Sequence, residues 1–115
     1  MGVEHLKPSV KLSFVNPDES HGPVFGPGVM ALCRGVQETG SLNAAAKSMG
    51  MAYSKAWRVL KETEAALGVQ LLVRDGAHGS TLTADCLTLL DAYDQVKSTV
   101  IDTASHKTAD LLASS

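Results

Sequence analysis

Three glycines, Gly40, Gly50 and Gly68, divide the middle of the chain into two short helical segments. The first segment, residues 42–49, contains three consecutive alanines, which favour a helix with almost no side-chain bulk. The second segment, residues 53–67, places apolar side chains on one face and cations on the other. Glycine suits the end of each helix because it adopts left-handed backbone angles without strain. This spacing predicts two helices that approach closely across a tight turn, the physical outline of a helix-turn-helix.

The segments on either side of this pair predict two more helices and a hairpin. Residues 28–38 repeat apolar side chains at i, i+3, i+4 and i+7, the spacing of an amphipathic helix. Residues 70–73 and 81–83 are predicted to be short strands joined by a glycine-rich loop. A last helix is expected to begin near Ala84 and to fray after about Ser105. Its apolar stripe consists of Cys86, Leu89, Leu90, Tyr93, Val96 and Val100.

The N-terminal part of the chain holds three prolines, which exclude a helix of useful length. Between them, residues 9–15 alternate apolar and polar side chains with the period of a half-buried strand. Val10, Leu12 and Phe14 would share one face of this strand, and residues 16–20 are expected to form a turn.

Together these segments predict a mainly α fold with a small β component, the winged helix-turn-helix. Its parts are an N-terminal strand, a three-helix core, a β-hairpin wing and a C-terminal helix. We expect the strand and turn in residues 1–25, the winged helix-turn-helix domain in residues 26–105 and a flexible tail in residues 106–115. A chain of 115 residues suffices for one such core and is too short for two.

Hydropathy and charge limit the classes of protein to which this chain can belong. No stretch reaches the roughly 18 uninterrupted apolar residues of a membrane-spanning helix, which excludes a membrane protein. The N-terminus lacks the basic flank and apolar block of a secretory signal, so we expect a cytoplasmic protein. The formal net charge is -2, but residues 41–83 carry five Lys and Arg against three Asp and Glu. The predicted helix pair and hairpin are therefore the cationic part of the chain.

The sequence offers little for catalysis or metal binding. The four histidines are widely spread, and none has the spacing of a metal ligand from a carboxylate or a second histidine. Cys33 and Cys86 lie in apolar helical patterns, where buried thiols are much commoner than disulfides or metal ligands. The acid pair Glu62 and Glu64 is interpreted as solvated charge on an exposed helix face. We therefore expect no enzyme activity, no metal and no cofactor.

A family resemblance covers about residues 24–100. Residues 40–46, Gly-Ser-Leu-Asn-Ala-Ala-Ala, and residues 49–57, Met-Gly-Met-Ala-Tyr-Ser-Lys-Ala-Trp, resemble the N-terminal domain of ModE-type molybdate-responsive regulators. The Leu-Leu-Val-Arg of residues 71–74 matches the strand that leads into the wing of that domain. LysR-type regulators share the Gly-Ser-x-x-Ala-Ala-Ala opening and the Leu-Gly-Val-x-Leu-Leu-x-Arg ending, and Trp57 favours the ModE type.

The resemblance implies an interface with duplex DNA centred on a recognition helix at residues 53–67. Ser54, Lys55 and Arg58 lie in the first turns of this helix, where Arg58 or Lys55 would contact a guanine base. Two readings of Tyr53 stay open, since its ring suits the interior and its hydroxyl suits a phosphate. The implied DNA-binding residues are Ser41, Lys47, Tyr53, Ser54, Lys55, Arg58, Arg74 and His78.

The other implied contacts involve the DNA backbone. Ser41 and Lys47 would contact it beside the first helix of the pair, and Arg74 and His78 would contact it from the wing. Trp57 lies on the apolar stripe with the core residues and is expected inside the fold. The alternative for the cations is a solvated surface without a partner, and it weighs most for His78.

The sequence therefore predicts a DNA-binding transcriptional regulator of the ModE-type winged-helix class that binds duplex DNA as a homodimer. Because the chain ends at Ser115, we expect it to lack the molybdate-sensing domains of longer members and to bind no molybdate. Ala52 replaces the Ser or Thr that is usual in the family, and it can neither cap the recognition helix nor contact a phosphate. Two alternatives remain: a winged-helix protein-protein interaction module and a fragment of a LysR-like regulator.

Overall fold

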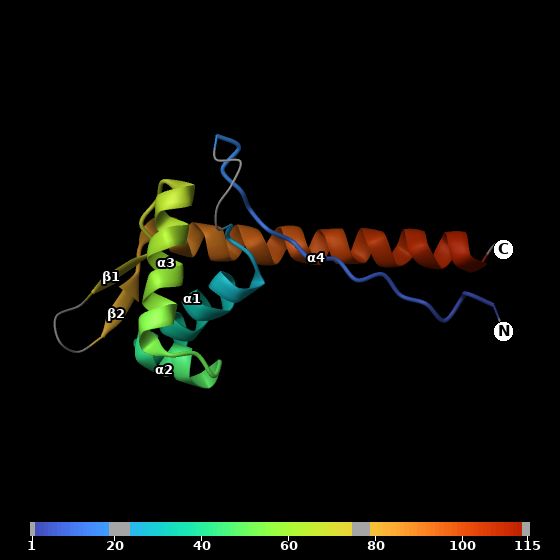
Figure 1. Ribbon diagram of the computed structural model, residues 1–115. Helices are drawn as coiled ribbons and strands as arrows, with labels where there is room; N and C mark the ends of the chain where they lie inside the picture. Colours follow the sequence, from blue (N-terminus) through green and yellow to red (C-terminus); the bar gives the residue numbers. More distant parts are fainter. Residues whose placement is uncertain (1, 19–23, 75–78, 114–115) are drawn as a thin grey trace.

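The computed structural model describes residues 2–18, 24–74 and 79–113. In chain order the elements are α1 (Pro27–Thr39), α2 (Leu42–Ser48), α3 (Tyr53–Leu67), β1 (Leu72–Arg74), β2 (Ser80–Leu82) and α4 (Ala84–Ala113). Figure 1 shows α1, α2 and α3 gathered at one end of α4, with the β1–β2 hairpin projecting beside them. The rest of α4 extends away from this group. The helices predicted at residues 28–38, 42–49 and 53–67 are confirmed.

Glycines end the three short helices as the sequence predicts. The φ angles are 72° at Gly40, 65° at Gly50 and 74° at Gly68, a conformation that glycine adopts without strain. Ser41 is the N-cap of α2, and its Oγ accepts a hydrogen bond of 3.1 Å from a backbone N–H in the first turn. Ala52 precedes α3 without a side-chain cap. The first N–H groups of α3 are therefore left without a capping side chain.

α1 and α2 cross at close range because each presents a small residue at the crossing. A Cβ on Gly35 would lie 2.7 Å from the Cβ of Ala45, so the backbones approach this closely only with glycine at position 35. The core lies between the three short helices, β1 and the first part of α4. Its buried side chains are Phe25, Val29, Leu32, Cys33, Val36, Leu42, Ala45, Ala46, Ala56, Leu60, Leu71, Leu72, Cys86, Leu90 and Tyr93.

The wing is an antiparallel pair that is tied to the end of α1. β1 and β2 align Arg74 opposite Ser80. The Ser80 N–H donates to the Gly40 carbonyl at 3.0 Å. A Cβ on Gly79 would lie 2.5 Å from the same carbonyl oxygen, so glycine is required where the wing passes the turn between α1 and α2.

The strand boundaries differ by one or two residues from those that the sequence predicts. Gln70 stays outside β1, and the Leu71 N–H donates to the carboxylate of Glu64 at 2.6 Å rather than to a strand. β2 ends before Thr83, whose Oγ1 accepts a hydrogen bond of 3.1 Å from a backbone N–H in the first turn of α4. The backbones still pair just outside these bounds, because the Thr83 N–H donates to the Leu71 carbonyl at 3.0 Å.

The strand predicted at residues 9–15 is wrong. Within the described N-terminal residues, strand pairing is limited to one bridge, in which Phe14 and Phe25 exchange two hydrogen bonds of 2.9 Å. The Tyr93 hydroxyl donates to the Leu12 carbonyl at 2.9 Å, and its ring contacts both phenylalanine rings edge-on. Because the ladder does not continue within residues 2–18 and 24–74, aromatic packing holds this segment instead.

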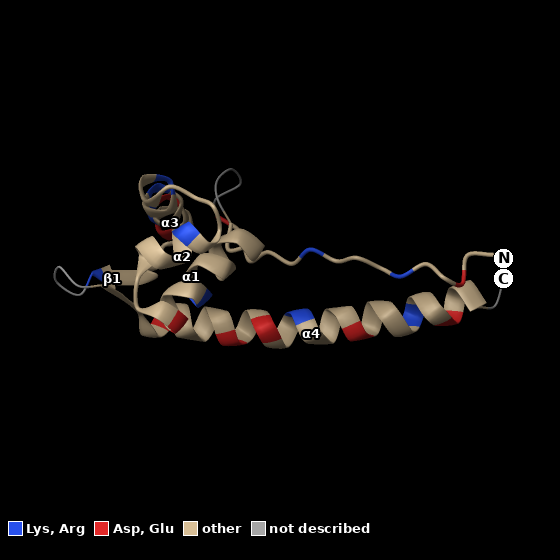
Figure 2. Cartoon of the chain, turned by 90° about the horizontal axis from the view of Figure 1, so that it is seen from below, with Lys and Arg blue, Asp and Glu red and all other residues tan. Residues whose placement is uncertain are grey.

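The face predicted for that strand is confirmed only in part. Leu12 and Phe14 are half-buried against the core, whereas the side chain of Val10 is exposed. Figures 1 and 2 show the N-terminal segment running extended along α4, with both ends of the chain on the same side of the molecule.

α4 is longer than predicted. It continues past Ser105 to Ala113, so the expected tail at residues 106–115 is helical as far as the structure describes it. The sequence contains no Gly or Pro after Ala84, and nothing interrupts the helix. Beyond Tyr93, none of its described residues is buried. Within the described ranges, no helix combines the length and the apolar character needed to cross a membrane.

Candidate nucleic-acid interface

α3 divides its side chains among three faces, as its 3.6-residue turn dictates. The buried face consists of Ala56, Leu60 and Thr63. The face that carries the contacts to the wing consists of Tyr53, Trp57, Lys61 and Glu64. The third face is exposed and carries Ser54, Lys55 and Arg58. Three of the predicted DNA-binding residues therefore lie together on the free face of the predicted recognition helix.

Arg58 is the most prominent cation of this free face. Its side chain is 66% exposed, and its Nε lies 4.0 Å from the Glu62 carboxylate one turn further along α3. An exposed ion pair at this distance contributes little, so the guanidinium remains available to another partner. Lys55 is also exposed and lies one turn nearer the start of α3.

The two DNA contacts predicted beside α2, Ser41 and Lys47, differ in burial and in hydrogen bonding. Ser41 is half-buried, and its Oγ accepts the capping hydrogen bond of α2 while keeping its own proton to donate. Lys47 lies exposed in the last turn of α2. Both residues stand where the sequence predicts them, at opposite ends of α2.

Tyr53 and Arg74 are brought together, although they belong to different elements. Tyr53 is the first residue of α3, its side chain is 38% exposed, and its hydroxyl accepts a hydrogen bond from the Arg74 guanidinium at the end of β1. The guanidinium carbon also lies 5.0 Å from the centre of the Trp57 ring. Trp57 is half-buried and packs against the core, as predicted, but its ring also contacts cations. The ring of Tyr53 is therefore not inside the fold, and a contact of its hydroxyl with phosphate stays a prediction.

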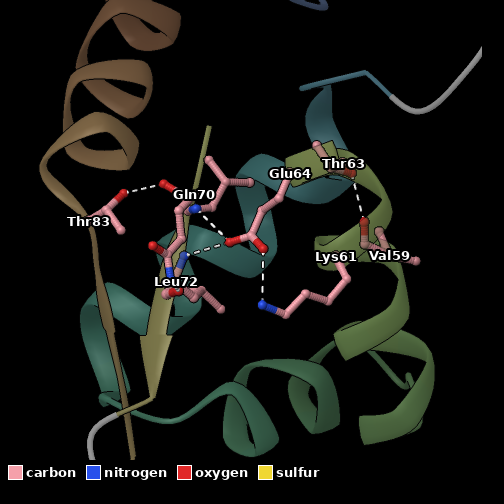
Figure 3. Close-up of polar contacts among 8 residues, drawn as sticks. Val59, Lys61, Thr63, Glu64, Gln70, Leu72 and Thr83 are labelled. Carbon is pink, nitrogen blue, oxygen red and sulfur yellow. Dashed lines mark hydrogen bonds and ion pairs between the residues drawn. The ribbon is translucent and has the colours of Figure 1, made fainter. Parts of the chain in front are cut away.

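Glu64 is not a solvated charge, and that sequence interpretation is wrong. Its side chain is 11% exposed, and one carboxylate oxygen accepts hydrogen bonds from the Leu71 and Leu72 N–H groups at 2.6 and 3.2 Å. The other oxygen lies 3.2 Å from the Lys61 ammonium. Figure 3 shows this carboxylate between β1 and Lys61. A spacing of eleven residues from Tyr53, three helical turns, was the available signal that Glu64 shares the face toward the wing.

The predicted wing contact His78 lies outside the described residues. The described charges differ between the helix pair with its hairpin and α4 (Figure 2). α2, α3 and the end of β1 together carry five Lys and Arg against two Glu, whereas α4 carries five Asp and two Lys. The cations predicted from the middle of the sequence therefore do lie near one another in the folded chain.

Cys33 and Cys86 are fully buried and unbridged, and they face each other between α1 and α4. A hydrogen bond to Cys86 and burial raise the pKa of the Cys33 thiol above its ordinary value, so this thiol stays protonated. Across residues 2–18, 24–74 and 79–113, no three His, Cys, Asp or Glu side chains gather as a metal site would require.

Comparison with known proteins finds one matching family model and solved structures with a similar fold. A family model described as "Bacterial regulatory helix-turn-helix protein, lysR family" matches residues 29–87, from α1 to the first turn of α4. No curated protein matches the chain. A solved structure described as "Crystal structure of CbnR_DBD-DNA complex" is 26% identical and has a TM-score of 0.59, covering 73% of this chain and 95% of that one.

These matches confirm the predicted winged helix-turn-helix fold. They give no support to the ModE-type resemblance, and they agree with the LysR-type features of the sequence, the Gly-Ser-x-x-Ala-Ala-Ala opening and the Leu-Gly-Val-x-Leu-Leu-x-Arg ending. The family match spans more than half of the chain and includes all three short helices and the wing. The chain belongs to the LysR-type family of bacterial regulatory helix-turn-helix proteins.

Proposed function

We propose that this chain is the DNA-binding part of a bacterial transcriptional regulator and has no enzyme activity. α3 enters the major groove of duplex DNA, and the β1–β2 wing lies against the adjacent backbone. The observation that carries this proposal is the similarity over 73% of the chain to a solved structure described as a complex with DNA. The exposed cations on the free face of α3 support it independently. Such a regulator acts in the cytoplasm, where the bacterial chromosome lies.

Within this proposal the contacts divide by geometry. Arg58 and Lys55 read base edges, because they stand on the free face in the first turns of α3. Arg74 and Tyr53 contact phosphate from the junction between the wing and α3, as His78 does from the wing. Ser41 and Lys47 contact the backbone beside α2, and Ser54 completes the face of α3.

The test is a salt titration of binding to a random-sequence duplex, followed by fluorescence anisotropy of labelled DNA. Binding through several phosphates gives a logarithmic affinity that falls linearly with the logarithm of salt concentration, with a slope of about -0.9 per phosphate. A slope of zero, or no binding at low salt, contradicts the proposal. That result favours the protein-protein interaction module, for which the exposed apolar side chains of α4 provide a surface.

We also propose that the chain acts as a homodimer through α4. The predicted stripe is partly used within one chain, since Tyr93 is buried and Leu89 is half-buried against the core. Further along α4, Val96 is 40% exposed and Ile101 is 39% exposed. Burying them against a second copy removes apolar surface from water, and two recognition helices then reach two half-sites.

Sedimentation equilibrium tests the dimer. The wild-type chain is expected at twice the monomer mass, and a Val96→Asp, Ile101→Asp variant at the monomer mass. The variant is expected to keep the helical circular dichroism of the wild type, because neither side chain is buried in one copy. A monomeric wild type at micromolar concentration overturns the proposal.

A finer proposal keeps the ModE-type assignment, on the pattern of residues 49–57. In it, this chain is a ModE-type regulator that binds DNA and does not bind molybdate. Calorimetry with molybdate tests it, since no heat of binding is expected at micromolar protein. Stoichiometric molybdate binding contradicts this finer assignment and leaves the LysR-type DNA-binding proposal unchanged.

A further inference from the structure

One face of α3 forms a continuous row of contacts toward β1. Tyr53, Trp57 and Lys61 follow one another at intervals of four residues, and Glu64 comes three residues later. On a helix this spacing places all four side chains in one line. Arg74 reaches this line from β1, so the row joins the recognition helix to the wing.

The Trp57 ring is the centre of the row because two cations lie on it. The Arg74 guanidinium carbon is 5.0 Å and the Lys61 Nζ is 4.6 Å from the ring centre, both within the range of a cation–π interaction. Each cation also has a polar partner on its outer side. The Tyr53 hydroxyl accepts a hydrogen bond from Arg74, and the Glu64 carboxylate pairs with Lys61 at 3.2 Å.

These contacts orient the Arg74 side chain without engaging all of its hydrogen-bond donors. A guanidinium has five N–H donors, and one of its two terminal nitrogens is engaged with Tyr53. The Tyr53 hydroxyl accepts in this bond and keeps its own proton to donate. An unrestrained arginine samples many rotamers, and a partner must order it on binding. Stacking on Trp57 orders the side chain beforehand.

We propose that Trp57 is a positioning residue of the DNA interface, which holds Arg74 of the wing in the orientation that contacts a phosphate. This inference rests on the proposed function. Trp57 does not touch DNA itself. It acts through Arg74 and fixes the angle between the end of β1 and the start of α3, the two elements that contact DNA together.

The stack is tested first in the free chain. Trp57 is the single tryptophan of the sequence, so its fluorescence reports on this ring alone. Arg74→Ala removes one cation from the ring and is expected to increase quenching by acrylamide and to shift the emission. Lys107→Met removes a cation from the far part of α4 and serves as the matched control, with no expected change. An unchanged spectrum for Arg74→Ala overturns the inference.

A double-mutant cycle then tests positioning on DNA. Trp57→Leu is expected to weaken binding to a fixed duplex about fivefold, a typical cation–π contribution, and Arg74→Ala about tenfold. In the Arg74→Ala background, Trp57→Leu is expected to have almost no further effect, because the residue it positions is gone. Trp57→Phe, which keeps an aromatic face, is expected to retain most of the affinity.

Three results contradict the inference. Equal losses from Trp57→Leu in both backgrounds show that the tryptophan supports the fold and not Arg74. Full affinity of Trp57→Leu shows that no positioning is needed. A wild-type chain that binds no duplex refutes the proposed function and the inference together, whereas a binding wild type with additive variants refutes the inference alone. Denaturation of each variant by urea identifies any that fails to fold.

Discussion

α3 and α4 both bury one part of their surface against the core, but they differ in what covers the rest. α3 has 15 residues, and its three faces are occupied by the core, by the wing and by exposed cations. α4 has 30 residues, and its buried positions end at Tyr93. The short helix thus leaves only its cationic face uncovered by the rest of the chain. The long helix leaves apolar side chains such as Val96 and Ile101 exposed, with no cover from the described part of the chain.

The largest expected effect is on the free energy of unfolding, and it distinguishes a buried residue of α3 from an exposed residue of α4. Leu60→Ala, on the buried face of α3, is expected to lower the free energy of unfolding by about 2–5 kcal/mol, because it leaves a cavity in the core. Ile101→Ala on α4 is expected to change it by less than about 0.5 kcal/mol in the monomer. Urea denaturation of both variants measures the difference. A large loss from Ile101→Ala in monomeric conditions contradicts the view that α4 is unsupported there.

Glu64 and Glu62 provide a matched pair within α3. Glu64→Leu removes a carboxylate that accepts two backbone hydrogen bonds, and we expect a loss of about 1.5–3 kcal/mol in the free energy of unfolding. Glu62→Leu removes only an exposed pair with Arg58 at 4.0 Å, and we expect almost no loss. Chemical denaturation checks both. Equal losses mean that the contact between Glu64 and β1 is unimportant.

Substitutions at the free face of α3 and at its contact with the wing are expected to differ in how they change the sequence specificity of DNA binding. Arg58→Ala is expected to cost about 1–3 kcal/mol in binding to a specific duplex and much less to a random one, because it loses a base contact. Arg74→Ala is expected to weaken binding to both duplexes alike and to lower the salt slope by about one. Anisotropy titrations give both ratios. If the two variants weaken both duplexes by the same factor, direct readout by Arg58 is wrong.

The smallest expected effect concerns Cys33 and Cys86, which join α1 to the buried start of α4. Both thiols are expected to be unreactive toward a disulfide reagent in the folded chain and reactive after unfolding. Because the folded pKa of Cys33 is raised, its contribution to stability is present below the ordinary thiol pKa of about 8.5 and is lost as the pH rises above it. Cys33→Ala is expected to weaken this pH dependence. A thiol that reacts rapidly in the native state contradicts the burial.

Much of the fold could be predicted from local patterns. The three short helices end where glycine follows, and their buried sides follow the apolar spacing. The extension of α4 beyond Ser105 had a local signal too, the absence of Gly and Pro, which polar composition obscured. The N-terminal strand failed because alternation predicts an extended backbone and says nothing about a neighbour to pair with.

The candidate site likewise contains residues that the sequence could place and residues whose contacts it could not predict. The exposed cations Lys55 and Arg58 could be placed from helix periodicity, since a free face needs no partner. The role of Glu64 could not, because an acid on a helix looks solvated until the strand that it holds is known. Trp57 was correctly placed against the core, but the two cations on its ring come from the packing of β1 beside α3 and from a rotamer of Lys61.

The sequence by itself determined the helices, their glycine ends and the exposed cations of α3, because these depend on residues within a few turns of one another. Only the tertiary structure decided which side chains hold the elements together. Glu64 meets Leu71 across 7 residues, Tyr53 meets Arg74 across 21, and Tyr93 meets Leu12 across 81. Such contacts depend on how the chain closes its loops and packs its core, and the spacing of residues along the sequence does not specify that geometry.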